Sequence, residues 1–147
     1  MPTPQSIASP IMKRSSQRVF LLLVLAQAAH SIEEYTTGLY EVFALAGFVS
    51  GLVANDLGVG FAIINSAFLA FGFWCYFVPI RLDWPSARAW AWLWVVVELA
   101  NGIGHAGLAP STGGYYPGAL TAPLLLVVAA WLAFLLNPSE RDLALHR

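Results

Sequence analysis

Four long apolar stretches, separated by shorter polar connections, dominate the pattern of this chain. A helix needs about 20 apolar residues to cross a hydrocarbon core of about 30 Å, and each stretch approaches or exceeds that length. The stretches cover residues 18–35, 58–80, 87–108 and 118–136. Pro85 precedes the third and Pro138 follows the fourth, as is typical of helix boundaries. The pattern therefore predicts an all-α protein, a four-helix transmembrane bundle.

The composition agrees with a location in a membrane. Hydrophobic residues make up 59% of the chain and charged residues 10%, whereas soluble domains average about 25% charged residues. The net charge is −1, so no basic surface indicates a nucleic-acid partner. The single cysteine, Cys75, cannot form an intrachain disulfide, and we expect it to serve in packing.

The domain organisation follows from the same pattern. Residues 1–17 are polar and rich in proline and serine, which predicts a mobile N-terminal tail. Residues 18–137 form the transmembrane domain, and residues 138–147 form a second tail.

Basic residues indicate the orientation of the spans. With four spans, all seven lie on one side of the membrane: Lys13, Arg14, Arg18, Arg81, Arg88, Arg141 and Arg147. Cytoplasmic loops and tails collect lysine and arginine. We therefore expect a multi-pass protein of the cell membrane with both termini in the cytoplasm.

Residues 39–54 are apolar but carry Glu41, Gly47, Ser50 and Gly51. A fifth span here would place the arginines of the C-terminal tail opposite Lys13, against the same charge rule. We therefore expect this segment at the outer face, either at the membrane interface or as a re-entrant segment.

The N-terminus allows a second interpretation. Lys13 and Arg14, a short apolar run and the small residues around Ala28 resemble a signal peptide with its cleavage site. Cleavage after Ala28 would remove the first span, and an intact mass would reveal it.

Two of the predicted spans carry ionisable or polar groups, although a charge near the bilayer centre costs roughly 2.5–3.5 kcal/mol. His30 and Glu34 are four residues apart in the first span and share one helix face, with Glu33 beside them. Residues 98, 101 and 105 of the third span, a glutamate, an asparagine and a histidine, fall within about 60° of arc. The first and third spans therefore each bear a polar stripe.

The two stripes lie at similar heights in the predicted membrane. His30 lies about 18 Å beyond Arg18, and Asn101 about 20 Å beyond Arg88, at the usual helical rise. If the two helices touch, these groups meet in the outer half of the bilayer.

Carboxylates and imidazoles on facing helices are typical of metal sites in helical bundles. The candidate ligands for Zn or Fe are His30, Glu33, Glu34, Glu98 and His105. Without a metal, a buried His–Glu pair could act as an acid and base, and Glu33, Glu34 and Asn101 are the candidate catalytic residues. The alternative is that these groups only hydrogen-bond to one another. Such bonds average about 0.6 kcal/mol in bilayers, which is small compared with the cost of burying three acids.

Three short motifs accompany these stripes. Residues 30–34 (HSIEE) match an HXXEE pattern, residues 101–105 (NGIGH) match NxxxH, and residues 115–118 (YYPG) match YxPG. In this order the chain resembles the HXXEE family of integral membrane proteins, whose function is unassigned. The resemblance supports a site built from the motif residues His30, Glu33, Glu34, Asn101, His105, Tyr115, Pro117 and Gly118. It does not indicate a reaction, and Glu98 and Tyr116 rest on spacing alone.

The YxPG motif closes the third connection, after the flexible pair Gly113 and Gly114. Tyr115 could cover the cluster as a lid or proton donor, or anchor the chain at the membrane interface. Pro117 and Gly118 are expected to set the turn into the fourth helix.

These observations favour an intramembrane enzyme acting on a lipid-like or isoprenoid small molecule. It would be a metal-dependent hydrolase or oxidase, or a metal-free isomerase or cyclase. One alternative is a proton-coupled transporter or channel, for which four spans would require a homo-oligomer. The other is a scaffold that binds membrane lipids.

Overall fold

A computed structural model describes residues 11–112 and 114–137, and all regular structure in these residues is helical. The prediction of an all-α protein is therefore confirmed. The α-helices are α1 (Arg14–Thr36), α2 (Leu39–Val42), α3 (Ala44–Gly51), α4 (Leu57–Cys75), α5 (Ala87–Leu108) and α6 (Ala122–Leu136). A π-helix (Tyr76–Ile80) continues α4, and a 3₁₀ turn (Ala109–Thr112) follows α5. Most of both predicted tails, including Arg141 and Arg147, lies outside the described residues.

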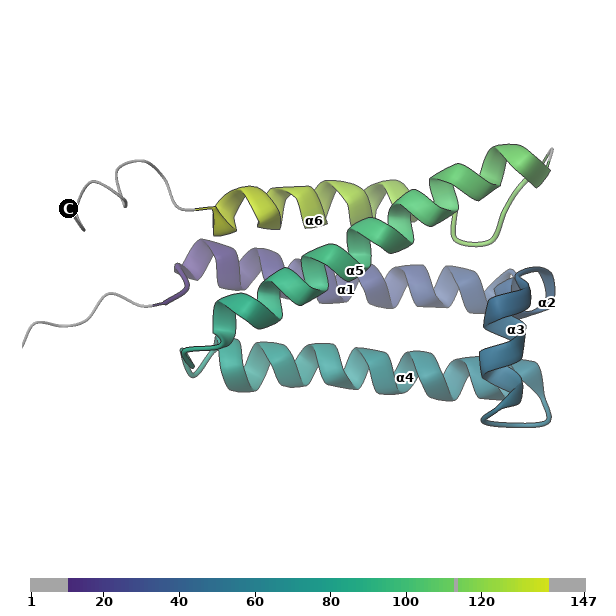
Figure 1. Cartoon of the computed structure of the whole chain (residues 1–147), viewed down its shortest axis with the longest axis horizontal. Helices are drawn as coiled ribbons and strands as arrows, with labels where there is room; N and C mark the ends of the chain where they lie inside the picture. The colour runs from purple at the N-terminus through teal and green to yellow at the C-terminus, as the bar shows by residue number, and fades with distance from the viewer. Residues whose placement is uncertain (1–10, 113, 138–147) are drawn as a thin grey trace, which may run out of the picture.

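The four long helices run lengthwise beside one another, in alternating directions (Figure 1). Residues 11 and 137 lie at one end of the bundle, which we call the tail end, and α2, α3 and the connection after α5 lie at the other, the far end. α6 packs against both α1 and α5, and α4 packs against α1. α5 crosses the bundle diagonally, so that its C-terminal part lies beside α6.

The half of the bundle near the tail end has an apolar core. Phe20 and Leu23 of α1, Trp94 of α5 and Leu132 of α6 are at most 1% exposed. The ring of Phe20 meets Trp94 edge-on, with centroids 6.0 Å apart. Gly72 lets α4 approach the same ring, because a Cβ there would lie 2.7 Å from Trp94.

Helix α1 begins at Arg14, four residues before the predicted start of the first span. The backbone amides of Ile11 and Met12 donate hydrogen bonds to the carboxylate of Asp83, at 3.1 and 3.3 Å, and Met12 is buried. The predicted mobile tail, residues 1–17, was therefore too long at its C-terminal end. Asp83 lies about 70 positions away, so no local pattern indicated this contact.

Residues 39–54 form two short helices that lie across the far end of the bundle (Figure 1). Helix α3 has 8 residues and is thus about 12 Å long, too short for a fifth span. It packs closely on α4, since a Cβ at Gly60 would lie 2.1 Å from the carbonyl oxygen of Ser50.

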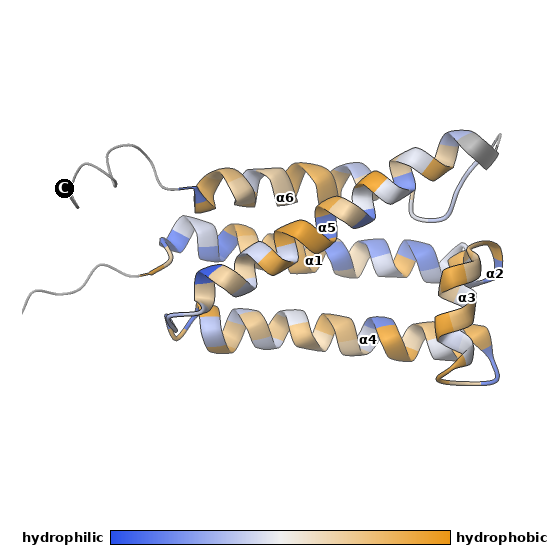
Figure 2. Ribbon diagram, in the orientation of Figure 1, coloured by the Kyte–Doolittle hydropathy of each residue, from blue (hydrophilic) through white to orange (hydrophobic). Residues whose placement is uncertain are grey.

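Among the described residues, one helix is both long and apolar enough to cross a membrane, the continuous stretch Leu57–Ile80. Helix α6 is apolar but has 15 residues. Only 22% of the most apolar window of Leu57–Ile80 is buried, so its apolar surface faces outward. Figure 2 shows apolar residues along most of α4, and polar residues concentrated in the far half of α1.

Candidate metal centre and its pocket

Two histidines and a glutamate from α1 and α5 meet at the far end of the bundle. His30 and Glu34 lie one turn apart on α1, and His105 comes from the last turn of α5; all three are buried. The Nε2 atom of His105 lies 2.9 Å from Oε1 of Glu34, and that of His30 lies 3.3 Å from the same oxygen. The two imidazole centroids are 4.7 Å apart. The polar stripes of the two helices therefore meet.

These distances suit a metal ion. Each of the three residues offers one ligand atom within 4.8 Å of the others. A tetrahedral site with bonds of about 2.0–2.1 Å places its ligand atoms roughly 3.3 Å apart, close to the 2.9 and 3.3 Å separations from Glu34. His30, Glu34 and His105 could therefore hold an ion with little movement.

The orientation of His30 is set from its other nitrogen. Its Nδ1 lies 2.7 Å from the hydroxyl oxygen of Thr121, and that hydroxyl also bonds to Oε2 of Glu33. An ionised carboxylate only accepts hydrogen bonds, so the Thr121 hydroxyl donates to Glu33 and accepts from Nδ1–H of His30. In neutral imidazole this leaves a lone pair on Nε2, facing Glu34. This arrangement fixes the orientation of the His30 ring, as outer hydrogen bonds do for histidine ligands in known metal sites.

The spacing had made Glu33 a candidate ligand, but it does not join the donor group, by which we mean His30, Glu34 and His105. Its carboxylate accepts hydrogen bonds from the backbone amides of Leu120 and Thr121, at 3.0 and 2.8 Å, and from the hydroxyl of Tyr115. These amides come just before α6, where the helix dipole also favours a negative charge. Glu33 therefore holds the loop before α6 and acts on the site through Thr121.

Tyr115 does not cover the cluster, and the neighbouring Tyr116 takes the place expected for it. Tyr115 is 58% exposed and bonds to Glu33, whereas the buried ring of Tyr116 lies 5.7 Å from that of His105. Burial and the negative charge of Glu34 raise the pKa of Tyr116. Burial and the hydrogen bond to Glu33 raise the pKa of Tyr115. Both hydroxyls are therefore protonated at neutral pH.

Glu98 is wholly buried but lies apart from the donor group. It precedes His105 by seven residues, which is about 10 Å along the helix, too far to share one ion. Neither of its oxygens makes a hydrogen bond of good geometry within the described chain, although the Asn101 amide interacts with it. The predicted role of Glu98 as a ligand of this centre was therefore wrong: a shared stripe does not imply a shared height.

Asn101, a candidate catalytic residue, belongs to a polar layer on the tail-end side of His30, Glu34 and His105. Its amide donates to Gln27 at 3.4 Å, Gln27 donates to Ser31 at 3.0 Å, and Ser31 donates to Asn65 at 2.8 Å. The layer links α5, α1 and α4. Asn101 also lines the pocket beside the centre.

Gly118 packs directly against both histidines. Its φ is +86°, and a Cβ there would lie 2.5 Å from Cε1 of His105 and 2.9 Å from Cε1 of His30. Sequence reasoning assigned this glycine only to a turn. The structure shows that the close approach of the loop to the imidazoles also requires it.

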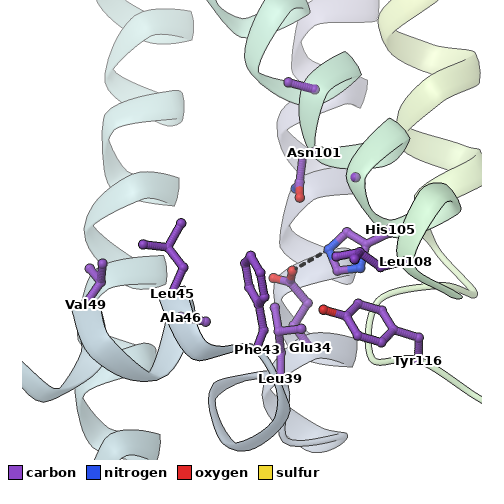
Figure 3. Close-up of a pocket in the computed structure, with 12 residues that line it drawn as sticks. Glu34, Leu39, Phe43, Leu45, Ala46, Val49, Asn101, His105, Leu108 and Tyr116 are labelled. Carbon is purple, nitrogen blue, oxygen red and sulfur yellow. Dashed lines mark hydrogen bonds and ion pairs between the residues drawn. The ribbon is translucent and has the colours of Figure 1, made fainter. Parts of the chain in front are cut away.

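A pocket of about 350 Å³ opens beside the centre (Figure 3). The carboxylate of Glu34, His105, Asn101 and Tyr116 provide its polar part. Apolar and small residues of α2, α3, α5 and the junction between α2 and α3 provide the rest: Leu39, Phe43, Leu45, Ala46, Val49, Ala100, Gly104 and Leu108. The centre thus borders a cavity that is mostly apolar.

A family model described as proteins of unknown function with an HXXEE motif matches residues 21–132. The chain belongs to this family. Searches of curated proteins and of solved structures each found no match. In this HXXEE protein the first and last residues of the motif, His30 and Glu34, offer atoms that could hold a metal ion, and Glu33 holds the loop before α6. Thr121 lies outside the three motifs, and no sequence signal indicated it, since it lies 91 positions from His30.

Proposed function

We propose that this HXXEE protein is a metal-dependent enzyme of a cell membrane, with His30, Glu34 and His105 as the ligands of one ion. The convergence of their three donor atoms carries the proposal. Four spans with both termini in the cytoplasm are supported by the alternating helices and by the placement of lysine and arginine. The outward apolar surface of Leu57–Ile80 also supports a membrane location.

Two histidines and one carboxylate form the ligand set of both zinc hydrolases and non-haem iron oxygenases. Three protein ligands leave room for water or substrate, and the pocket borders the centre where Glu34 and His105 line it. A bound ion would supply Lewis acidity and activate water, if it is Zn²⁺, or oxygen, if it is Fe²⁺. We therefore propose hydrolysis or oxidation as the reaction.

The surrounding residues have separate roles in this proposal. Glu33 and Thr121 hold His30 in the tautomer that presents Nε2. The ring of Tyr116 lies 5.7 Å from that of His105, and its protonated hydroxyl can donate a hydrogen bond to a substrate oxygen. Asn101, at the other end of the polar lining (Figure 3), can hold a second oxygen. The apolar lining favours a lipid-like substrate.

The test is the metal content of the protein purified in detergent without added chelator. We expect about one Zn or Fe per chain, and a loss to background in His30→Ala, Glu34→Ala and His105→Ala. The exposed Glu41 of α2 provides a matched control, and Glu41→Ala should keep the ion. Circular dichroism of each variant shows whether its helices remain. Substoichiometric metal that these substitutions leave unchanged would refute the proposal.

Glu98 favours a second candidate, a proton-coupled carrier. A buried acid near a His–Glu cluster, here on its tail-end side, is typical of proton relays in membrane transporters. Proton flux into liposomes that Glu98→Gln abolishes, without a change in metal content, would favour the carrier over the enzyme.

A further inference from the structure

The pocket beside the centre lies between α3 and α5. In Figure 3, Leu45 and Val49 of α3 stand on one side, and Asn101 and His105 of α5 on the other. Leu45 is 60% exposed and Leu108 is 38% exposed, although both line the pocket. The pocket is therefore open to the outside between α3 and α5.

Small residues on α5 create the room for this pocket. Ala100 and Gly104 line it one turn apart, and a Cβ at Gly104 would meet no atom within 4 Å. A side chain at this position would extend into the cavity. The space is narrow, since a pocket of about 350 Å³ lies near the lower limit for small-molecule sites.

The polar part of the pocket selects a head group. On the proposed function, a divalent ion with one carboxylate and two neutral imidazoles leaves a net positive charge, which attracts an anionic oxygen. The Asn101 amide and the Tyr116 hydroxyl add neutral hydrogen-bond donors. Within the pocket lining, Glu34 is the acidic residue, and its charge is opposed by the ion.

We propose that the pocket binds a single hydrocarbon chain with an anionic oxygen head group, which enters sideways between α3 and α5. The head lies against His105 and Asn101, and the chain lies along Leu45 and Leu108. Gly104 determines whether the chain fits. This inference rests on the proposed function for the charge of the head group and on the pocket alone for the path of the chain.

The experiment uses a photoreactive long-chain fatty acid with a diazirine in mid-chain, added to the full-length protein in phosphatidylcholine nanodiscs. Mass spectrometry should locate the label on peptides that contain Leu45 and Leu108. We expect Gly104→Leu to reduce labelling at least fivefold. Leucine is a good helix former, so the substitution should not weaken α5. Excess oleate should compete with the label, whereas hexadecane, which has no head group, should not.

Gly107→Leu is the matched control. Gly107 lies on the same helix with equally open space around its Cβ, but it does not line the pocket. Its substitution should leave labelling unchanged. Wild-type labelling of Gly104→Leu, or equal competition by hexadecane, would overturn the inference.

The metal content of the same samples separates the two proposals. Full metal with labelling that Gly104→Leu does not reduce would overturn the pocket inference alone. Labelling that depends on Gly104 in a protein without metal would instead overturn the proposed enzyme and retain the path of the chain.

Discussion

The two halves of the bundle use close helix contacts for different purposes. Near the tail end, Gly72 makes room for the ring of Trp94, and large apolar side chains fill the space around it. At the far end, Gly118 makes room for two imidazoles, and a polar cluster and a pocket lie beside a smaller apolar cluster of Leu39, Phe61 and Tyr116. We therefore expect the tail half to provide most of the stability, whereas the far half holds the candidate metal centre and its pocket.

The largest expected effect is on stability in the tail half. Leu132 is fully buried in its core, and we expect Leu132→Ala to lower the free energy of unfolding by about 2–3 kcal/mol. This is the lower part of the range for buried leucines, because in a membrane the lost packing dominates. Unfolding in detergent measures it, and the metal content of the folded variant should not change. Phe134 of the same helix is 76% exposed, so an equal loss in Phe134→Ala would contradict the comparison.

The next effect is on the candidate metal centre. Gly118→Ala should lower metal affinity roughly 10–100-fold, as changes around metal ligands do, because the new Cβ displaces both imidazoles. The positive φ of residue 118 adds a stability cost of about 1 kcal/mol. Competition with a chelator measures the affinity. Gly107→Ala, in open space on α5, should leave it unchanged; unaltered affinity in Gly118→Ala would show that the loop does not support the centre.

Replacing Glu98 tests whether this buried acid contributes to the stability of the bundle. A buried acid without good hydrogen bonds is costly, and apolar replacements of buried charged groups are often neutral or stabilising. We therefore expect Glu98→Leu to raise the free energy of unfolding by about 1 kcal/mol and to leave metal content intact. Glu98→Ala, which leaves a cavity, should not stabilise. A marked loss of stability in Glu98→Leu would show that the acid is structurally required.

The smallest effect concerns the loop before α6. Tyr115 donates a hydrogen bond to Glu33 at an exposed position, so Tyr115→Phe should cost at most about 1 kcal/mol at pH 7. Because the pKa of Tyr115 is raised in the folded protein, this contribution is complete below the unfolded pKa of about 10 and is lost as pH rises through the folded pKa. Unfolding of both proteins from pH 7 to 11 should show the difference shrink as the pH rises above about 10. A difference that grows with pH would contradict it.

Helical periodicity predicted much of this architecture. The expected range of the third span, residues 87–108, coincides with α5, and the two polar stripes meet, although Asn101 bonds to Gln27 and it is His105 that meets His30. Whether the helices cross a membrane, and in which direction, stays a prediction.

Assignments within the site were less predictable. Glu33 and Glu34 are adjacent, yet one binds the amides of the loop before α6 and the other faces His105. Tyr115 and Tyr116 are separated in the same way. Loop residues follow no period, so their orientation depends on contacts from distant parts of the chain.

The sequence by itself determined the long helices and the approximate height of each polar group, because the 3.6-residue repeat and the helical rise are local properties. Only the tertiary structure decided which groups share the centre, since hydrogen bonds across some 90 positions orient Thr121, Glu33 and His30. It also decided where the pocket lies, because α3 and α5 leave space between them only after α4 and α6 have positioned each of them.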